Sequence, residues 1–182
     1  MPRNATLTLN DGNTIPQFGY GVWQVEPDVA EEVVTKALET GYRHIDTAKI
    51  YGNEEGVGRA IAKSGIPREE LFITTKLWND DQGYDSALKA IDGSLERLGL
   101  DYVDLYLIHW SQPKKGKYLE TWKAFQEIKK SGKARSIGIS NFGEEASRRS
   151  STPVTSPPHT RSSCTPTSTR RPCAIWMLST RL

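Results

Sequence analysis

Four polar residues follow one another through the sequence at intervals of about thirty residues. Asp46 is followed by Lys76 after 30 residues, by His109 after 33 more and by Ser140 after a further 31. Each stands at the end of a short apolar run, and Tyr51 lies five residues after Asp46. A repeating unit of strand and helix would deliver one such residue per strand end. A buried carboxylate is costly unless it is paired, so Asp46 requires a cation, and the pattern is typical of a site rather than of a core.

These side chains could supply the proton in the reduction of a carbonyl group, a reaction that takes a hydride at carbon and a proton at oxygen. A tyrosine can donate the proton, but with an ordinary pKa of about 10 it is a weak acid. A nearby lysine ammonium would lower the pKa of the phenol, and a carboxylate would keep the lysine charged. We therefore expect Tyr51 to be the general acid, Lys76 to adjust its pKa and Asp46 to hold Lys76. His109 would orient the carbonyl oxygen by hydrogen bonding.

Each of these residues also has an ordinary structural explanation. A single lysine at a strand end is usually solvated, and a single histidine after an apolar strand is more often a structural residue. The tryptophans Trp23, Trp78 and Trp110 could equally belong to a core. Joint occurrence at successive strand ends favours the site interpretation. The basic loop 114–117 is interpreted as a solvated loop.

Strands and helices that would position these residues alternate along the chain. Turn residues at 10–13 between alternating segments predict an N-terminal hairpin, and residues 17–23 predict a strand that ends in a glycine-bearing loop. Further strands are expected at His44–Asp46, Leu71–Lys76, Val103–Ile108 and Arg135–Ile139. Asn53 and Glu54 are expected to begin a helix, with side chains suited to its free first-turn N–H groups.

Apolar residues at helical spacing predict one helix after the strand at 17–23 and one after each of the next three strands. The stripes are Ala30, Val33, Val34, Ala37 and Leu38; Val57, Ala60 and Ile61; Tyr84, Ala87, Leu88, Ile91, Leu95 and Leu98; and Leu119, Trp122, Phe125 and Ile128. Strands separated by helices imply a parallel sheet with right-handed crossovers. No GxGxxG follows the first strand, which counts against a dinucleotide-binding Rossmann domain. Polar residues at several strand ends instead suit a (β/α) barrel.

Five motifs, in order along residues 5–145, resemble the aldo-keto reductase family. They are Gly41-Tyr42-Arg43-His44-Ile45-Asp46-Thr47-Ala48, Tyr51-Gly52-Asn53-Glu54, Thr75-Lys76-Leu77-Trp78, Leu107-Ile108-His109-Trp110 and Ile137-Gly138-Ile139-Ser140-Asn141-Phe142. The sequence is most similar to the bacterial branch that includes 2,5-diketogluconate reductases. Lys49 and Ser111 depart from the residues usual in the family at those positions. Because both lie beside the acid–base residues, the departures concern substrate range more than chemistry.

The resemblance implies a carbonyl reductase that uses NADPH, with NADH as an alternative, on a (β/α)8 TIM barrel. The cofactor would be contacted by Gly21, Val22, Asp46, Ser140 and Asn141, of which the last two would hold the nicotinamide carboxamide. Trp23, Trp78, His109 and Trp110 would line the substrate pocket. The catalytic set would be Asp46, Tyr51, Lys76 and His109, with no metal. The partner would be a small-molecule carbonyl substrate, and the full-length protein would be a monomer.

The net charge of +2 conceals two different parts of the chain. All 22 acidic residues precede Ala146, together with 18 of the 24 lysines and arginines, whereas the remaining 37 residues hold six arginines and no acid. We therefore do not expect a nucleic-acid partner. No apolar run approaches a membrane span and no signal peptide is evident, so a cytoplasmic protein without a membrane partner is expected. Both cysteines lie in the last part, at Cys164 and Cys173, which does not suggest a disulfide framework.

Residues 146–182 differ in composition from the rest, with eight Ser, seven Thr, five Pro and six Arg. This composition predicts disorder, and a basic interaction tail would be its functional interpretation. We favour a shift of reading frame near Glu145. Codons can be chosen for residues 151–170 that, read from the third base, encode DTGDVTAAHQVELHPYFNQ, which resembles the next strand motif of the family.

Residues 1–145 are accordingly expected to form the N-terminal part of the barrel, with about five βα units and an N-terminal β-hairpin. Residues 146–182 are expected to be a disordered, out-of-frame tail. Because a closed barrel needs at least about 200 residues, two functions are predicted from different classes. The first is an aldehyde or ketone reductase with Tyr51 as proton donor. The second is a catalytically inactive truncated fragment or binding module that lacks the site for the cofactor's phosphates and adenosine.

Overall fold

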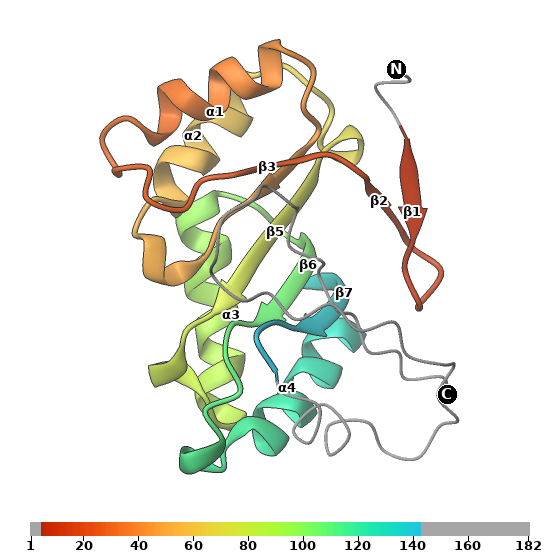
Figure 1. The fold of residues 1–182 in the computed structure, drawn as a ribbon, viewed down its shortest axis with the longest axis vertical. Helices are drawn as coiled ribbons and strands as arrows, with labels where there is room; N and C mark the ends of the chain where they lie inside the picture. The colour runs from red at the N-terminus through yellow and green to blue at the C-terminus, as the bar shows by residue number, and fades with distance from the viewer. Residues whose placement is uncertain (1–4, 143–182) are drawn as a thin grey trace, which may run out of the picture.

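The computed structural model describes residues 5–142, and its centre is a five-stranded parallel sheet in the order β3-β4-β5-β6-β7 (Figure 1). The strands are β3 (Gly19–Gly21), β4 (His44–Asp46), β5 (Phe72–Leu77), β6 (Val103–Ile108) and β7 (Ala134–Ile139). Spatial order follows chain order, as in a barrel wall. The predicted α/β class and incomplete barrel are confirmed.

Four helices connect the strands and form a row in which each helix contacts the next (Figure 1). They are α1 (Ala30–Glu39), α2 (Glu54–Lys63), α3 (Tyr84–Leu98) and α4 (Tyr118–Lys130). Short 3-10 turns precede or follow strands at η1 (Lys49–Tyr51), η2 (Arg68–Glu70), η3 (Asn79–Asp81) and η4 (Pro113–Lys115). The turns η1, η3 and η4 follow the carboxyl ends of β4, β5 and β6, so they border the end of the sheet where the polar residues lie.

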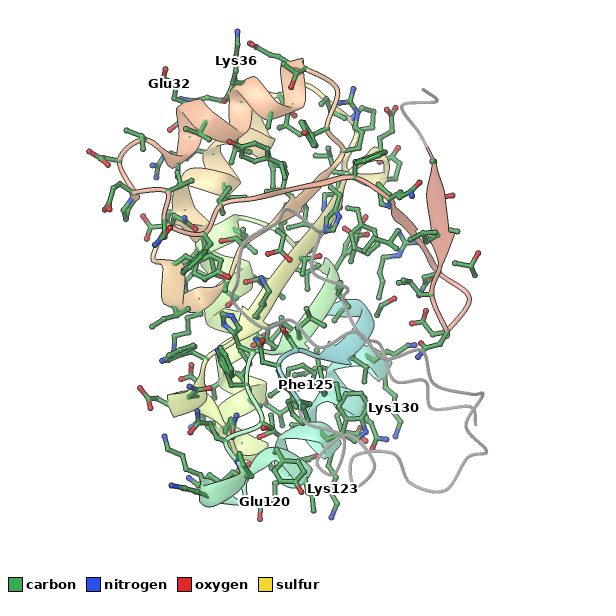
Figure 2. The ribbon with its side chains drawn as sticks, viewed as in Figure 1. Glu32, Lys36, Glu120, Lys123, Phe125 and Lys130 are labelled. Carbon is green, nitrogen blue, oxygen red and sulfur yellow. The ribbon has the colours of Figure 1, made fainter. Side chains whose placement is uncertain are left out.

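The main core lies between the sheet and this row of helices. Strand residues that face the helices, such as Ile45, Ile73 and Ile108, are fully buried there. Tyr106 of β6 stacks on Phe125 of α4 with ring centroids 4.6 Å apart. Figure 2 shows that labelled charged side chains on the outer faces of α1 and α4 point away from the sheet. Most residues of the predicted helical stripes are buried in this core or packed against it. Val33 is only partly buried, and two further exceptions are given below.

The predicted hairpin is present as the antiparallel pair β1 (Thr6–Thr8) and β2 (Thr14–Pro16). Ile15 packs with Phe72, Leu105 and Leu107 in a second, smaller apolar cluster. At the turn, Asn13 Nδ2 donates to Ser136 Oγ at 2.9 Å near the start of β7. The hairpin therefore covers the N-terminal ends of the strands, away from the expected site.

Two predictions of local structure were wrong in detail. The strand expected at Leu71–Lys76 runs from Phe72 to Leu77, because Leu71 still closes the turn η2 by donating to the Arg68 carbonyl. Tyr84 and Leu119, expected on buried helix faces, are each 41% exposed. Both lie in the first turn of a helix, Tyr84 in α3 and Leu119 in α4.

The expected domain limit at residue 145 and the expected out-of-frame tail lie outside the described residues. Among residues 5–142, no helix is both long and apolar enough to cross a membrane.

Candidate active site

Parallel register brings the predicted site residues to one edge of the sheet. Gly21 of β3 is paired with Asp46 of β4, Asp46 with Thr74 of β5, and Lys76 with Leu107 of β6. Residues after the strands continue this edge, since the His109 N–H donates to the Leu77 carbonyl and the Ser140 N–H to the Ile108 carbonyl. The carboxyl ends of all five strands therefore present their polar residues on the same side.

Lys76 and Asp46 form an ion pair at this edge. The Lys76 ammonium donates to Asp46 Oδ1, and also to the Thr47 carbonyl at 2.9 Å. The lysine side chain is 8% exposed and the aspartate side chain 23% exposed. A lysine this buried would lose its charge without a carboxylate partner. The cation that the sequence required for Asp46 is therefore Lys76.

Tyr51 lies over this pair, with the Lys76 ammonium 5.2 Å from its ring centroid. The half-buried tyrosine is brought there by the turn η1, which follows Asp46 directly. We expected Lys76 to lower the pKa of this phenol, but the net shift is a rise. Burial and the Asp46 carboxylate raise the pKa of Tyr51 to about 12. The ammonium faces the ring while its protons are directed to Asp46 and Thr47, so Tyr51 keeps its proton at neutral pH.

His109 faces Tyr51 and two tryptophans. Its ring centroid lies 5.8 Å from that of Tyr51, 5.4 Å from that of Trp78 and 6.4 Å from that of Trp110. Burial and the Lys76 charge lower the pKa of His109 to about 4, so the imidazole is neutral at pH 7. Its Nδ1 atom is buried and has no hydrogen-bond partner among the described residues. A neutral histidine can donate one N–H to an incoming carbonyl oxygen.

The three tryptophans that were expected to line a pocket differ in exposure. Trp23 is 68% exposed and Trp110 is 45% exposed, whereas Trp78 is half-buried against His109. Buried Gln82 donates to the Trp110 carbonyl at 2.7 Å, which fixes the loop after β6. Trp78 and Trp110 thus adjoin the acid–base residues, and Trp23 is the most exposed of the three, on the loop after β3.

The residues expected to contact a cofactor lie at the ends of β3 and β7. An added Cβ at Gly21 would meet no atom within 4 Å, so the backbone here is open to close approach by a ligand. Val22 is completely buried in the main core, and its backbone N–H and carbonyl already have hydrogen-bond partners. Asn141, with φ 56°, donates to the His109 carbonyl at 2.9 Å and to the Ser140 hydroxyl at 3.1 Å. Open backbone at one end and an amide–hydroxyl pair at the other fit a flat, polar ring system.

Two residues at the start of α2 have roles that the sequence did not indicate. Asn53 and Glu54 were expected to cap the helix, but neither caps the first turn with its side chain. The Glu54 carboxylate accepts from Thr75 Oγ1 at 2.6 Å and from Arg97 Nη2 at 2.7 Å, which ties α2 to β5 and α3. The Asn53 amide reaches back to the loop that carries Trp23. Only the preference of polar residues for helix starts was visible in the sequence, and it suggested the wrong partners.

Lys49, one of the two residues expected to depart from the family pattern, forms an ion pair with Asp81 at 2.5 Å. The pair joins the turn before Tyr51 to the turn after Trp78. In residues 5–142, no group of three or more histidine, cysteine or acidic side chains is arranged to hold a metal ion.

A sequence model described as "Aldo/keto reductase family" matches residues 15–157, which is more than half of the chain. The chain belongs to the aldo/keto reductase family. Among curated relatives, the glyoxal reductase of Bacillus subtilis is 57% identical over 138 residues, which cover 75% of this chain and 49% of that protein. Family membership agrees with the resemblance drawn from the five motifs.

Solved structures of the family share the fold. The aldo/keto reductase of Brucella melitensis is 60% identical with a TM-score of 0.78, and the match covers 81% of this chain and 57% of that one. The aldo-keto reductase of Bombyx mori in complex with NADP is 44% identical with a TM-score of 0.75, covering 81% and 53%. The chain spans about half the length of the curated relatives it matches.

Proposed function

We propose that this protein is a reductase that converts aldehydes or ketones to alcohols with NADPH, and that Tyr51 donates the proton. The observation that carries the proposal is the arrangement of Tyr51 between the buried Lys76–Asp46 pair and His109. Family membership and a relative named glyoxal reductase support a small carbonyl substrate. We expect it to act in the cytoplasm, without a nucleic-acid or membrane partner, and as a monomer at full length.

Tyr51 would deliver its proton to the substrate oxygen while His109 donates a hydrogen bond to the same atom. Because the pKa of Tyr51 is about 12, the phenol is fully protonated before reaction. Phenolate formed during the reaction would lie beside the Lys76 ammonium, which stabilises the developing charge. Asp46 keeps that ammonium charged and directed. Trp78 and Trp110 would restrict the entry of water beside His109.

The cofactor, when bound, supplies the hydride. Ser140 and Asn141 would hold its carboxamide, and the open backbone at Gly21 would admit its ring. The amide of Asn141 also bonds the His109 carbonyl, so the cofactor side and the substrate side of the site are linked through one residue. A structure of the Bombyx mori relative that contains NADP supports NADPH as the cofactor, and NADH is the alternative.

The proposal is tested by following NADPH oxidation with glyoxal or methylglyoxal as the substrate. Tyr51→Phe removes only the proton donor, so we expect at least about a 10²-fold loss of kcat with cofactor affinity nearly unchanged. Tyr42→Phe is the matched control, because that tyrosine is 37% exposed and precedes β4, at the opposite end of the strand from Asp46. Turnover of Tyr51→Phe equal to that of the control would refute the assignment.

The second function, an inactive fragment or binding module, is favoured by the open edges of the described sheet. Strands β3 and β7 each pair with only one neighbour within residues 5–142. A thermal-shift titration with NADPH distinguishes the two functions, since a ligand that binds the folded state raises its apparent stability. A reductase should show a saturable rise in Tm together with turnover. A chain that shows neither result would be the inactive alternative.

A further inference from the structure

Asn53 uses its whole side chain in a buried network that borders the candidate site. The residue is completely buried. Its Nδ2 donates to the Val22 carbonyl and the Val25 carbonyl, both at 2.9 Å, and its Oδ1 accepts from Thr47 Oγ1 at 2.8 Å. An amide that satisfies three buried groups at once is expensive to replace, because each lost partner leaves an unpaired polar atom.

The two carbonyls that Asn53 binds enclose the loop that carries Trp23. This loop also contains Gln24, whose φ of 62° is uncommon for a residue other than glycine. Inside the loop itself, the Val25 N–H donates to the Val22 carbonyl at 3.2 Å. A loop with an unfavourable residue and an exposed tryptophan needs an external anchor to keep one conformation. The Asn53 amide provides that anchor at both ends of the loop.

Through its Oδ1 atom, Asn53 is also connected to the acid–base residues. Thr47 donates its hydroxyl to Asn53, and its backbone carbonyl accepts from the Lys76 ammonium. Thr47 and Lys76 are both buried, so water does not replace these bonds. A continuous path of hydrogen bonds therefore runs from Lys76 through Thr47 and Asn53 to the Trp23 loop.

We propose that Asn53 is a positioning residue that holds the Trp23 loop in the conformation that binds substrate and links this loop to Lys76 through Thr47. The proposal rests on the proposed reductase function. It deepens that function because it assigns substrate affinity to a buried amide that has no contact with the reacting atoms. Asn53 acts through Trp23 on substrate binding, while Asp46 and the Thr47 carbonyl continue to hold Lys76.

Asn53→Asp separates these two connections. The carboxylate can still accept from the Thr47 hydroxyl, but it has no N–H for the Val22 and Val25 carbonyls and repels their oxygens. The substituted residue is the N-cap of α2, where a negative charge is favoured by the helix dipole. A carboxylate buried here without a cation is costly, so we expect the variant to be less stable than the parent. At temperatures where it is folded, the Lys76 contacts should persist while the loop loses its anchor.

The first measurement is hydrogen exchange followed by mass spectrometry on the full chain. Exchange of backbone amides in residues 22–25 should accelerate by about tenfold in Asn53→Asp, with β5 and β6 unchanged. Thr75→Val is the matched control, because it removes a buried hydroxyl that bonds Glu54 at the same helix start without touching the loop. Unchanged exchange in residues 22–25, or equal acceleration in the control, would overturn the proposal.

The second measurement is steady-state kinetics with NADPH and methylglyoxal. In Asn53→Asp, KM for the aldehyde should rise about tenfold, with kcat within about twofold and an unaltered pH profile. A loss confined to kcat would overturn the positioning role. Parent protein without turnover would refute the proposed reductase, whereas the exchange measurement would still decide whether Asn53 anchors the loop.

A second variant, Asn53→Ser, tests the same proposal if the aspartate variant does not fold. The serine hydroxyl is too short to reach both carbonyls, and the substitution introduces no charge. The same acceleration at residues 22–25 and the same rise in KM are expected. A folded Asn53→Ser protein with parental loop exchange and parental KM would overturn the proposal.

Discussion

Tyr51 and His109 face each other across the candidate site, and burial shifts their pKa values in opposite directions. The pKa of Tyr51 is raised to about 12 and that of His109 is lowered to about 4, because burial disfavours the charged form of each. Both residues are therefore neutral through the physiological pH range. A site with two neutral donors suits an incoming carbonyl oxygen, which can only accept hydrogen bonds.

Stability should fall as the pH drops from about 6.5 toward about 5. The unfolded chain protonates His109 near its ordinary pKa of 6.5, whereas the folded state resists protonation down to about 4. The unfolded state therefore binds more protons in this window, and lower pH favours unfolding by roughly 1–2 kcal/mol through His109. Buried His44, whose pKa is lowered mainly by burial, acts in the same direction. Urea denaturation at pH 7 and pH 5 measures the change in the free energy of unfolding. In His109→Gln, this change between the two pH values should be smaller.

Lys76 and Asp46 should behave as one unit in catalysis. Lys76→Met should reduce turnover at least as much as Asp46→Asn, because Lys76 faces the phenol directly and Asp46 acts through it. The double variant should lose far less than the product of the two single losses. The four proteins are compared by kcat for aldehyde reduction. Multiplicative losses would contradict a shared network.

Helix packing depends on one very close approach between α2 and α3. A Cβ added at Gly58 would lie 2.3 Å from the Leu98 carbonyl oxygen, which is a backbone atom that cannot move aside. Glycine is therefore required by space here, in a helix interior where alanine would otherwise be preferred. The contact lets α2 lie close to α3, where Glu54 reaches Arg97.

Gly58→Ala should destabilise the protein by about 1–3 kcal/mol despite the better helix propensity of alanine. Gly93→Ala is the control, since its Cβ would meet only the flexible end of Arg97 at 3.2 Å. That substitution should leave stability unchanged or raise it slightly. The free energy of unfolding in urea checks both variants. Equal effects at the two positions would show that the close approach does not exist in solution.

Much at the level of elements could be predicted from the sequence, because strand and helix patterns arise from local periodicity. Side-chain partners could not, because they depend on which elements come together. The start of α2 shows the difference: its position was predicted, yet apart from the bond between Asn53 and Thr47, the side-chain partners of Asn53 and Glu54 lie 21 to 43 positions away. Leu119 fits a helical stripe, yet the structure leaves it 41% exposed.

At the scale of the whole molecule, the N-terminal hairpin is tied to the last described strand and helix. Asn13 donates to Ser136 Oγ, and Asp11 pairs with Lys129 at 2.7 Å, so the ties span more than a hundred residues of chain. Burial opposes ionisation of Asp11, but the hydrogen bond from Lys129 leaves its pKa lowered overall. These contacts hold the far end of the sheet together.

Asn13→Ala should reduce the free energy of unfolding by about 1 kcal/mol, since it removes the bond to buried Ser136. Carbonyl reduction should be unaffected at temperatures where the variant is folded, because the hairpin lies at the opposite end from Tyr51. Urea denaturation and NADPH oxidation measured side by side test this. A selective loss of turnover would contradict the separation of the two ends.

The meeting of Asp46, Lys76, His109 and Ser140 at one edge could be foreseen, because parallel strands of regular spacing align their carboxyl ends. The electrostatics of Tyr51 could not, because the sequence shows that a lysine is nearby but not that its protons are directed elsewhere. Burial then determined the sign of the pKa shift. Geometry inside the site was the part that periodicity does not encode.

The buried Lys76–Asp46 pair also restricts how this sequence can diverge over evolutionary time. Losing either residue alone leaves an unpaired charge inside the protein, at a cost of about 3–5 kcal/mol, whereas replacing both by apolar residues of similar size can be nearly neutral. If both residues are replaced one after the other, the free energy of unfolding should therefore fall at the first substitution and recover at the second. The two positions are expected to change together or not at all, whether or not a descendant is an active reductase.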